Sequence, residues 1–349
     1  MIRTGTGNLL EADVDALVNT VNCAGVMGKG IALQFKQAWP DMYKVYRADA
    51  EAGRIVPGRI HVWQTGLLQR PRFILNFPTK RHWKGKSRLE DIELGLLDLV
   101  NQVGSLGIRS IAIPPLGAGN GGLDWAEVRP RIIDAFAPLP DLEVLLWEPG
   151  MAPPVEERPV NTERPHLTPV RAAVLGLMGR YSVLDYGLSQ LEVQKLAYFL
   201  QVAGENLRLD YKAATYGPYA ERLYHLLMHL EGHQVVGLED RSPGAALRLE
   251  PRAVDEAESF LASHPETKAR FERVAELIDG FETPYGMELL SSVHWVACHD
   301  GQARGSASAA LAAVHAWSPR KRATFKPHHV NVAWERLRDN GWLAQTPQA

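Results

Sequence analysis

The chain has 349 residues, 46% of them hydrophobic and 22% charged, with a formal net charge of −2. These values are typical of a soluble globular protein large enough for two domains. No apolar run approaches the ~18 residues that span a bilayer, and the N-terminus lacks a signal-peptide pattern. Two cysteines, Cys23 and Cys298, are too few for a disulfide framework or a cysteine zinc site. We therefore expect a cytoplasmic protein with no membrane contact and no metal.

Strand and helix patterns alternate through residues 1–150. Short apolar runs with few polar residues occur at 15–21, 59–65, 72–78, 110–115 and 142–148. Amphipathic, helix-like stretches lie between them at 30–39, 42–52, 89–107 and 124–136. Strands with so few polar residues are usually covered on both faces. This half is therefore predicted to be a three-layer α/β domain.

The pattern changes after residue 150. Residues 151–169 are rich in proline and charge and have no apolar period, which predicts a semi-rigid spacer. Residues 170–349 then repeat apolar positions at intervals of three and four, which predicts a mainly α-helical domain. One of its helices should begin with a capping box, Ser189 followed by Glu192.

Two glycine-dense stretches, Gly25–Gly30 and Gly117–Gly122, each lie between a predicted strand and a predicted helix. Glycines at this position let backbone N–H groups approach phosphate oxygens at a helix N-terminus. The second stretch also fits G-x-G-x-x-G, so an NAD-binding Rossmann domain is the alternative. That fingerprint normally opens the fold, whereas here only one predicted strand follows it. Two ordinary turns are the simpler interpretation of either stretch alone.

The sequences "GTGNLLEADVDALVNTVNCAGVMGKGIA" and "PPLGAGNGGLDW" resemble the macrodomain family, which binds ADP-ribose. The resemblance covers residues 1–150 and implies a three-layer α/β macrodomain with a mixed sheet, followed by the mainly helical domain. It places adenosine near Thr6–Leu10, where Asn8 replaces the usual Asp but keeps a carbonyl acceptor. The implied ADP-ribose contacts are Asn8, Leu9, Thr20, Asn22, Gly28, Lys29, Gly30, Ile31, Ala32, Gly117, Ala118, Gly119, Asn120, Gly121, Gly122 and Leu123.

A basic segment, "NFPTKRHWKGKSRLED", follows the apolar run at 72–78. Its lysines and arginines alternate with aromatic residues, a combination that suits phosphates and stacked bases of single-stranded DNA. A solvated loop before the next helix is the alternative. The predicted DNA contacts are Arg81, His82, Trp83, Lys84 and Lys86.

The "PTK" that ends in Lys80 resembles the lysine-dependent macrodomains, and most closely the DNA ADP-ribosyl glycohydrolase antitoxins called DarG. The resemblance implies that Lys80 and Asn22 are the catalytic residues, with Asn22 beside the distal ribose. It also implies that ADP-ribose is released from thymidine as a product without a cofactor. A neutral lysine could attack the anomeric carbon, and a protonated one could stabilise the departing base. A related branch has an acidic residue where this chain has Asn120. Asp124 is expected to be a helix N-cap.

The second half resembles the Panacea-type antitoxin domain at Lys195-Leu196 and at Tyr216-Gly217-Pro218. The resemblance implies a toxin-binding domain whose partner is a cognate DNA ADP-ribosyltransferase of the DarT type. Residues 254–289 hold nine acidic residues against three basic ones, so an acidic face could occupy such a toxin's DNA groove. A solvated helix face is the alternative. The overall expectation is an antitoxin enzyme that acts on ADP-ribosylated single-stranded DNA. The alternative is a non-catalytic ADP-ribose reader or a toxin-sequestering binding protein.

Overall fold

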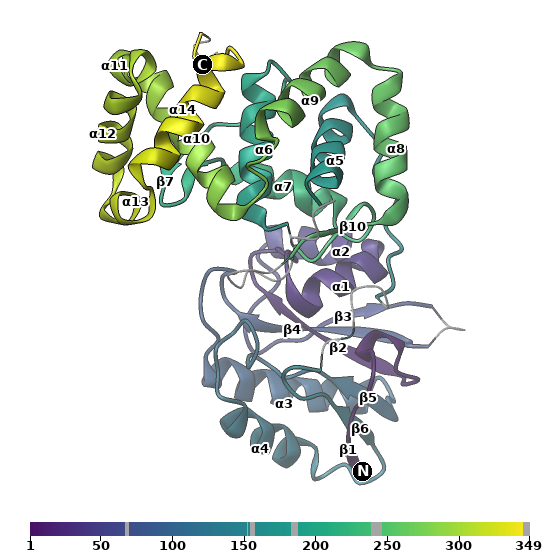
Figure 1. Cartoon of the computed structure of the whole chain (residues 1–349). Helices are drawn as coiled ribbons and strands as arrows, with labels where there is room; N and C mark the ends of the chain where they lie inside the picture. The colour runs from purple at the N-terminus through teal and green to yellow at the C-terminus, as the bar shows by residue number, and fades with distance from the viewer. Residues whose placement is uncertain (67–69, 152, 154–157, 183–187, 239–245, 345–349) are drawn as a thin grey trace. The chain divides into compact units, whose positions relative to one another are not determined.

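The computed structural model describes residues 1–66, 70–151, 153, 158–182, 188–238 and 246–344 (Figure 1). The chain divides into two compact units, Met1–Glu163 and Arg164–Ala349. This boundary falls within the predicted spacer 151–169, of which residues 152 and 154–157 lie outside the described residues. The side chain of Asn161 donates to the Ala38 carbonyl at 2.8 Å, so part of that stretch is packed on the first unit. No helix of the described residues is long and apolar enough to cross a membrane.

The first unit is built on a mixed sheet in the order β1-β6-β5-β2-β4-β3. Neighbouring strands are parallel except for β3, which runs antiparallel to β4 at the edge. The strands are β1 (Ile2–Thr4), β2 (Ala16–Asn22), β3 (His61–Gln64), β4 (Phe73–Lys80), β5 (Ser110–Ile113) and β6 (Glu143–Leu146). The helices are α1 (Gly30–Ala38), α2 (Pro40–Glu51), α3 (Leu89–Ser105) and α4 (Trp125–Phe136), with a short 3-10 helix at Leu9–Glu11.

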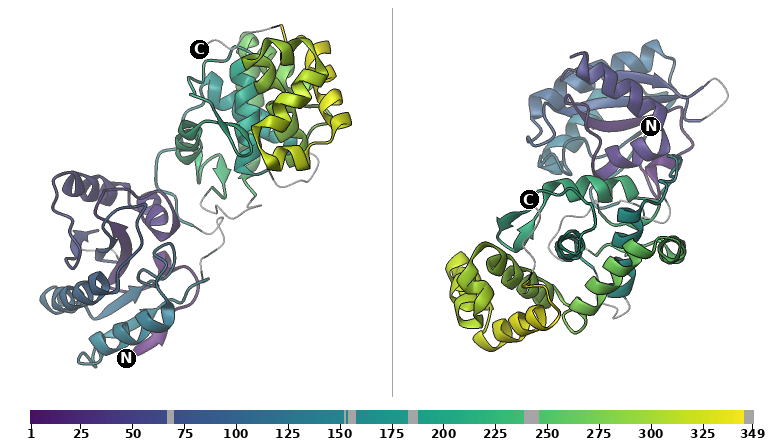
Figure 2. Two further views of the ribbon diagram at one scale, coloured as in Figure 1. Left: turned by 90° about the vertical axis from the view of Figure 1, so that its left-hand side faces the viewer. Right: turned by 90° about the horizontal axis from the view of Figure 1, so that it is seen from above.

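Helices cover both faces of this sheet, as the apolar strands predicted (Figures 1 and 2). On β2, Leu17 and Val21 pack toward α1 and α2, whereas Ala16 and Val18 pack toward α3 and α4. This alternation follows from the two-residue period of a strand. It fixes which side chains of β2 face each of the two helical layers. The prediction of a three-layer α/β domain with a mixed sheet is confirmed.

A chain of polar side chains crosses the buried centre of the sheet. Asn19 on β2 has no exposed surface and donates to Asn76 on β4 at 2.8 Å. The Asn76 amide lies 3.0 Å from His61 Nδ1, and His61 Nε2 lies 2.9 Å from Asp49. These bonds join β2, β4, β3 and α2. We infer that Asn19 fixes strand register and does not contact a ligand.

The second unit is mainly helical, as predicted, and its helices pack side by side around a continuous apolar core (Figure 2). The predicted capping box is present, with the backbone N–H of Ser189 donating to Glu192 at 2.6 Å. Two small sheets, β7–β8 and β9–β10, were not predicted. Their strands are β7 (Lys212–Ala214), β8 (Gly217–Tyr219), β9 (Val235–Val236) and β10 (Arg248–Leu249). The helices are α5 (Pro169–Ser182), α6 (Gln190–Val202), α7 (Glu221–Leu230), α8 (Pro251–Ala262), α9 (Pro265–Ile278), α10 (Pro284–His299), α11 (Gly301–Gly305), α12 (Ala307–Trp317), α13 (Pro319–Thr324) and α14 (Pro327–Asp339).

Candidate active site

The first glycine loop runs from the end of β2 to the start of α1 and is shaped by Asn22. The Asn22 amide donates to the Val26 carbonyl at 2.5 Å, and its Oδ1 accepts from the N–H groups of Ala24 and Val26 at 3.0 and 3.3 Å. The Tyr46 hydroxyl donates to the Asn22 backbone carbonyl. These bonds engage both ends of the amide, so Asn22 positions the first glycine loop. Its predicted catalytic role stays a prediction.

The N-terminus of α1 is well suited to an anion. The helix begins at Gly30, whose φ of +61° is the left-handed conformation that favours glycine. Lys29 is the N-cap, and its side chain has no acceptor that could cap the first backbone N–H groups. Those groups, from Ile31 onward, carry the positive end of the helix dipole. A phosphate placed there would accept their hydrogen bonds.

The second glycine loop follows β5 and ends at Asp124. As predicted, Asp124 is the N-cap of α4 and accepts from the Ala126 N–H at 2.9 Å. A Cβ on Gly121 would collide with the Gly117 carbonyl and the Ser87 hydroxyl, so only glycine fits there. The Ser87 N–H also donates to the Gly121 carbonyl at 3.0 Å. Ser87 thus supports the loop, although no sequence motif singled it out.

The two glycine loops meet. An ideal Cβ built on Gly30 would lie 2.9 Å from the Asn120 side-chain nitrogen, so the start of α1 faces the tip of the second loop. The loops follow strands β2 and β5, which are parallel neighbours, so both leave the sheet at the same edge. In open α/β sheets this carboxyl edge is where ligands bind. The predicted ADP-ribose contacts of the first loop, at residues 28–32, therefore face those of the second loop, at residues 117–122.

Lys80 is the last residue of β4 and lies close to both glycine loops. It is in register with Asn22 on β2, beside a bulge between Val21 and Asn22. The Lys80 amine donates to the backbone carbonyl of Asn120 in the second glycine loop. Partial burial lowers the pKa of Lys80, and the nearby positive charge of Lys29 lowers it further. Lys80 thus lies where the first loop, the second loop and the end of β4 meet.

The predicted adenosine end lies at the 3-10 helix Leu9–Glu11. Asn8 caps that helix, with its Oδ1 accepting from the Leu10 N–H at 3.1 Å. Leu9 is buried in the core beneath the turn. The Trp147 indole donates to the Gly7 carbonyl at 2.9 Å, which ties the turn to the end of β6. The first role of Asn8 is therefore to shape this turn.

In the segment predicted to contact DNA, Arg81 is bonded to a neighbouring helix and the residues that follow it are exposed. Arg81 forms two hydrogen bonds, of 3.1 and 3.0 Å, with the buried carboxylate of Asp91 on α3. Such a bidentate pair is geometrically specific, so Arg81 holds the segment to the helix. His82, Trp83, Lys84 and Lys86 are exposed. The Lys84 ammonium lies 4.8 Å from the centre of the Trp83 ring.

Cys23 follows β2 beside Lys80. Its backbone N–H donates to the Lys80 carbonyl at 2.9 Å. Burial raises the pKa of the Cys23 thiol, and the negative charge of Asp91 raises it further. A thiol held in its neutral form is a poor nucleophile. The amine of Lys80 is therefore the better candidate for nucleophilic attack at this edge of the sheet.

The family model described as "Macro domain" matches residues 18–132, the stretch that carries both glycine loops and Lys80. Together, the mixed six-stranded sheet, its two helical layers and the facing loops define the first unit as a macrodomain.

Similar proteins extend the match over almost the whole chain. A "DNA ADP-ribosyl glycohydrolase" of Thermus aquaticus is 51% identical over 343 residues, covering 98% of this chain and 94% of that protein. One of Mycobacterium tuberculosis is 42% identical over 353 residues, covering 97% and 99%. A "DNA ADP-ribosyl transferase-DNA ADP-ribosyl glycohydrolase fusion protein" of Thermosipho africanus is 34% identical over 139 residues, 36% of each chain. This chain belongs to the DNA ADP-ribosyl glycohydrolase family, and the Rossmann alternative is wrong.

We expect Gly30→Ala to weaken binding of ADP-ribose by at least about tenfold, equivalent to about 1.4 kcal/mol. The added methyl would meet the Asn120 side chain and would also strain the positive φ, so the loops would separate. Isothermal titration with ADP-ribose measures the effect. Gly107→Ala is the control, because Gly107 has a φ of +62° but no atom within 4 Å of an added Cβ. Equal affinities in the two variants would contradict a shared phosphate site.

Proposed function

We propose that this chain is a DNA ADP-ribosyl glycohydrolase that removes ADP-ribose from thymidine in single-stranded DNA and serves as an antitoxin. The observation that carries the proposal is the Lys80 amine, bonded to the second glycine loop at the edge where the first loop also ends. The names of the near full-length relatives support the same activity. A macrodomain that only reads ADP-ribose would need the two loops but not a partly buried lysine between them.

The reaction replaces the bond between the anomeric carbon of ADP-ribose and a thymine nitrogen with a bond to water oxygen. The products are free ADP-ribose and unmodified thymine, whose imide accommodates the electron pair of the broken bond. The transition state resembles an oxocarbenium ion. The reaction consumes only water, so we propose that it requires no cofactor. The DNA substrate also favours a cytoplasmic site of action.

Lys80 can promote this reaction in two ways. As a neutral amine it attacks the anomeric carbon, and water then cleaves the covalent intermediate. As an ammonium ion it stabilises the negative charge on the departing thymine. The lowered pKa of Lys80 favours the neutral form. The carbonyl of Asn120 accepts one amine hydrogen and so orients the nitrogen relative to the space between the loops.

We expect Lys80→Ala to lower kcat on an ADP-ribosylated oligonucleotide by about 10²–10⁴-fold, the range typical for loss of a positioned catalytic group. Release of ADP-ribose, followed by chromatography, measures the rate. Lys44→Ala is the matched control, since it also removes one lysine but from the exposed surface of α2, and it should keep kcat near wild type. Lys80 is not the catalyst if its alanine variant cleaves as fast as the wild-type protein. A wild-type protein that binds ADP-ribose without cleaving the oligonucleotide would instead be a reader.

The pH profile of kcat distinguishes the two roles of Lys80. Replacing Lys29 by Gln removes a neighbouring cation, so the pKa of Lys80 should rise toward its ordinary value. If the neutral amine attacks, the acidic limb of the profile moves to higher pH and kcat falls below the inflection. If the ammonium acts, the alkaline limb moves to higher pH instead. Lys44→Gln makes the same charge change on the exposed surface of α2. Identical profiles for the two variants would exclude electrostatic tuning by Lys29.

We propose that His82, Trp83, Lys84 and Lys86 contact the DNA strand beside the modified thymidine. They follow directly from Lys80 along the chain, so a strand bound to them would present its base to the amine. Trp83 offers a ring for base stacking, and the lysines match backbone phosphates. Arg81 anchors this segment through its Nε and Nη2, which donate to Asp91, and in this proposal its exposed Nη1 edge is left for a phosphate.

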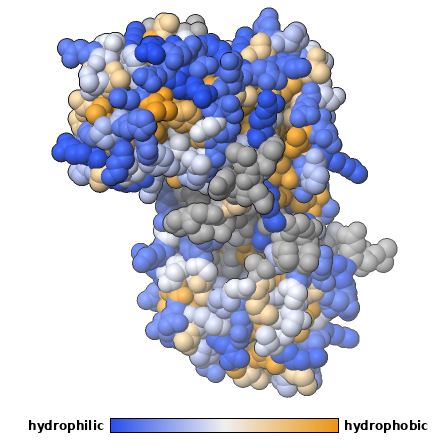
Figure 3. Space-filling view, viewed as in Figure 1, coloured by the Kyte–Doolittle hydropathy of each residue, from blue (hydrophilic) through white to orange (hydrophobic). Residues whose placement is uncertain are grey.

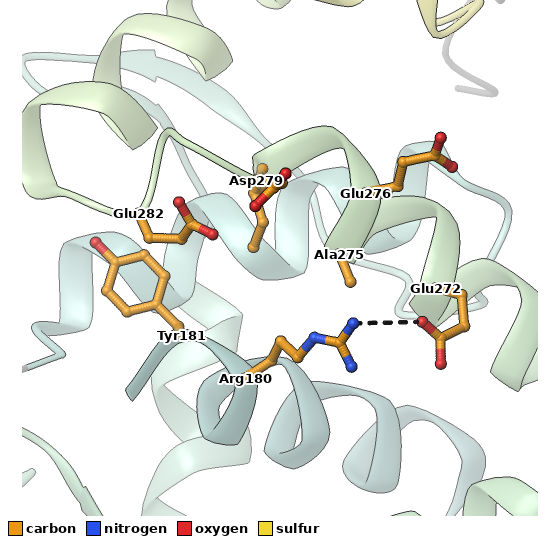
Figure 4. Close-up of a pocket in the computed structure, with 8 residues that line it drawn as sticks. Arg180, Tyr181, Glu272, Ala275, Glu276, Asp279 and Glu282 are labelled. Atoms are coloured by element: carbon orange, nitrogen blue, oxygen red, sulfur yellow. Dashed lines mark ion pairs between the residues drawn. The ribbon is translucent and has the colours of Figure 1, made fainter. Parts of the chain in front are cut away.

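The name of one relative and an acidic cavity in the second unit both support the proposal of a toxin partner. The Thermosipho relative carries a DNA ADP-ribosyl transferase and a glycohydrolase in one chain by its name. In this protein an open cavity of about 380 Å³ lies between α5 and α9 and is lined by Glu272, Glu276, Asp279 and Glu282 (Figure 4). Arg180 lies among them, 4.0 Å from Glu272. We propose that this acidic surface binds the basic DNA groove of the transferase.

We expect the double variant Glu276→Lys, Asp279→Lys to bind the transferase encoded beside this gene at least about tenfold more weakly, because it reverses charges at the contact. Biolayer interferometry with the full chain measures the affinity. The matched control reverses Asp255 and Glu258 on α8, which are exposed but do not line the cavity. Equal weakening in both variants would indicate a general charge effect, and no weakening in either would remove the cavity from the interface.

A further inference from the structure

The last part of the second unit is strongly basic. Residues 301–334 contain five lysines and arginines and no aspartate or glutamate, whereas residues 254–289 are acidic. Four of the five cations gather on α13 and on the turn that leads into α14: Arg320, Lys321, Arg322 and Lys326. A chain with a net charge of only −2 thus presents a concentrated positive surface at this place.

An exposed tyrosine lies against this basic segment. β7 and β8 form an antiparallel hairpin, and Tyr216 at its turn is 43% exposed. The Arg320 guanidinium lies 4.5 Å from the centre of the Tyr216 ring. The hairpin and α13 are therefore neighbours and contribute to one surface. Mainly hydrophilic side chains cover the visible side of α11–α13 (Figure 3).

Buried bonds hold this surface in place. The Lys195 amine, almost fully buried, donates to the Pro218 carbonyl of the hairpin at 2.7 Å. The fully buried Lys321 donates to Glu288 on α10 at 2.9 Å. Arg320 binds the same carboxylate through two bonds of 2.6 and 3.0 Å. Glu288 is thus shared between two cations, so the cluster keeps an excess of positive charge.

Two further cations have no carboxylate partner. Arg322 and Lys326 are both exposed, and neither forms an ion pair within the described part of the chain. Side chains of this kind remain available to a polyanion. The contact between Arg320 and Tyr216 brings an aromatic ring to α13, the helix that also carries Arg322. Cations for phosphates and an aromatic face for a base are the two elements of a single-strand contact.

We propose that Tyr216, Arg320, Arg322 and Lys326 form a second contact surface for single-stranded DNA, in addition to the segment 82–86 of the macrodomain. This inference rests on the proposed function only in taking DNA as the substrate. A polyphosphate fits better than an acidic protein, because the surface combines two exposed cations that form no ion pair in the described part of the chain, Arg322 and Lys326, with an exposed ring. Two contacts on one strand would raise the local concentration of modified bases at Lys80.

The charge contribution is tested with the double variant Arg322→Gln, Lys326→Gln in the full chain. Fluorescence anisotropy measures binding to an unmodified single strand of about 30 nucleotides, long enough for two contact regions. Loss of two phosphate contacts should weaken binding about tenfold at low salt and reduce the slope of log affinity against log salt by about 1.4. The matched control, Arg252→Gln with Lys268→Gln, makes the same charge change at exposed positions of α8 and α9.

The stacking contribution is tested with Tyr216→Ala. It should weaken binding about fivefold or more while leaving the salt slope unchanged, because stacking releases no counterions. Thermal unfolding of each variant controls for loss of structure. A Tyr216→Phe variant, which keeps the ring, should bind the strand like wild type.

The outcomes separate this inference from the proposed function. Cleavage of an ADP-ribosylated thymidine nucleoside, which has no further phosphates to bind this surface, should be unchanged in every variant of this surface. The inference is wrong if the double variant and its control bind the long strand equally. It is also wrong if DNA affinity is kept and only binding of the transferase falls, since the surface would then be a protein interface. Absence of cleavage by the wild-type protein would contradict the proposed function while leaving the DNA-binding comparison valid.

Discussion

The hydrogen bond from the Lys80 amine to the Asn120 carbonyl is the contact on which the site depends. It joins the end of β4 to the loop that follows β5, across the strand β2 that lies between them in the sheet. Parallel pairing of the three strands brings their carboxyl ends to one edge, where the first glycine loop also begins. A sheet with any of these strands reversed would place the amine and the loops at opposite edges.

Around this contact, several polar side chains serve the backbone rather than the ligand. Asn22 shapes the first loop, Asn8 caps the turn before it, and Ser87 supports the second loop. The backbone N–H groups that a loop presents to a phosphate are not engaged in the hydrogen bonds of a helix or a strand. Such a loop therefore needs other hydrogen bonds to hold its shape. Side-chain bonds of this kind keep such loops ordered.

The fold was largely predictable from the sequence, and the site only in part. Apolar runs without polar gaps indicated strands covered on both faces, and Asp124 and Ser189 marked helix starts, because those signals are local. The hydrogen-bond partners of Asn22 and Arg81 were not predictable from the sequence. The type of a residue shows which groups its side chain can bond to, but not which of those groups lies close to it in the fold. Arg81 lies ten residues from Asp91, and only the path of the segment between them brings the two together. The hydrogen bond between Ser87 and Gly121 was not predictable for the same reason. The β7–β8 hairpin was not predicted because its strands have three residues each and lie between two helices.

The acceptor of the Lys80 bond belongs to the main chain of residue 120, and this has a consequence for variants of the site. Substitution at that position alters the side chain but keeps the carbonyl, so the lysine retains its anchor whether asparagine or an acidic residue occupies it. Replacement of Asn120 by an acidic residue would therefore add a second titratable group beside Lys80 while keeping the acceptor that orients the amine.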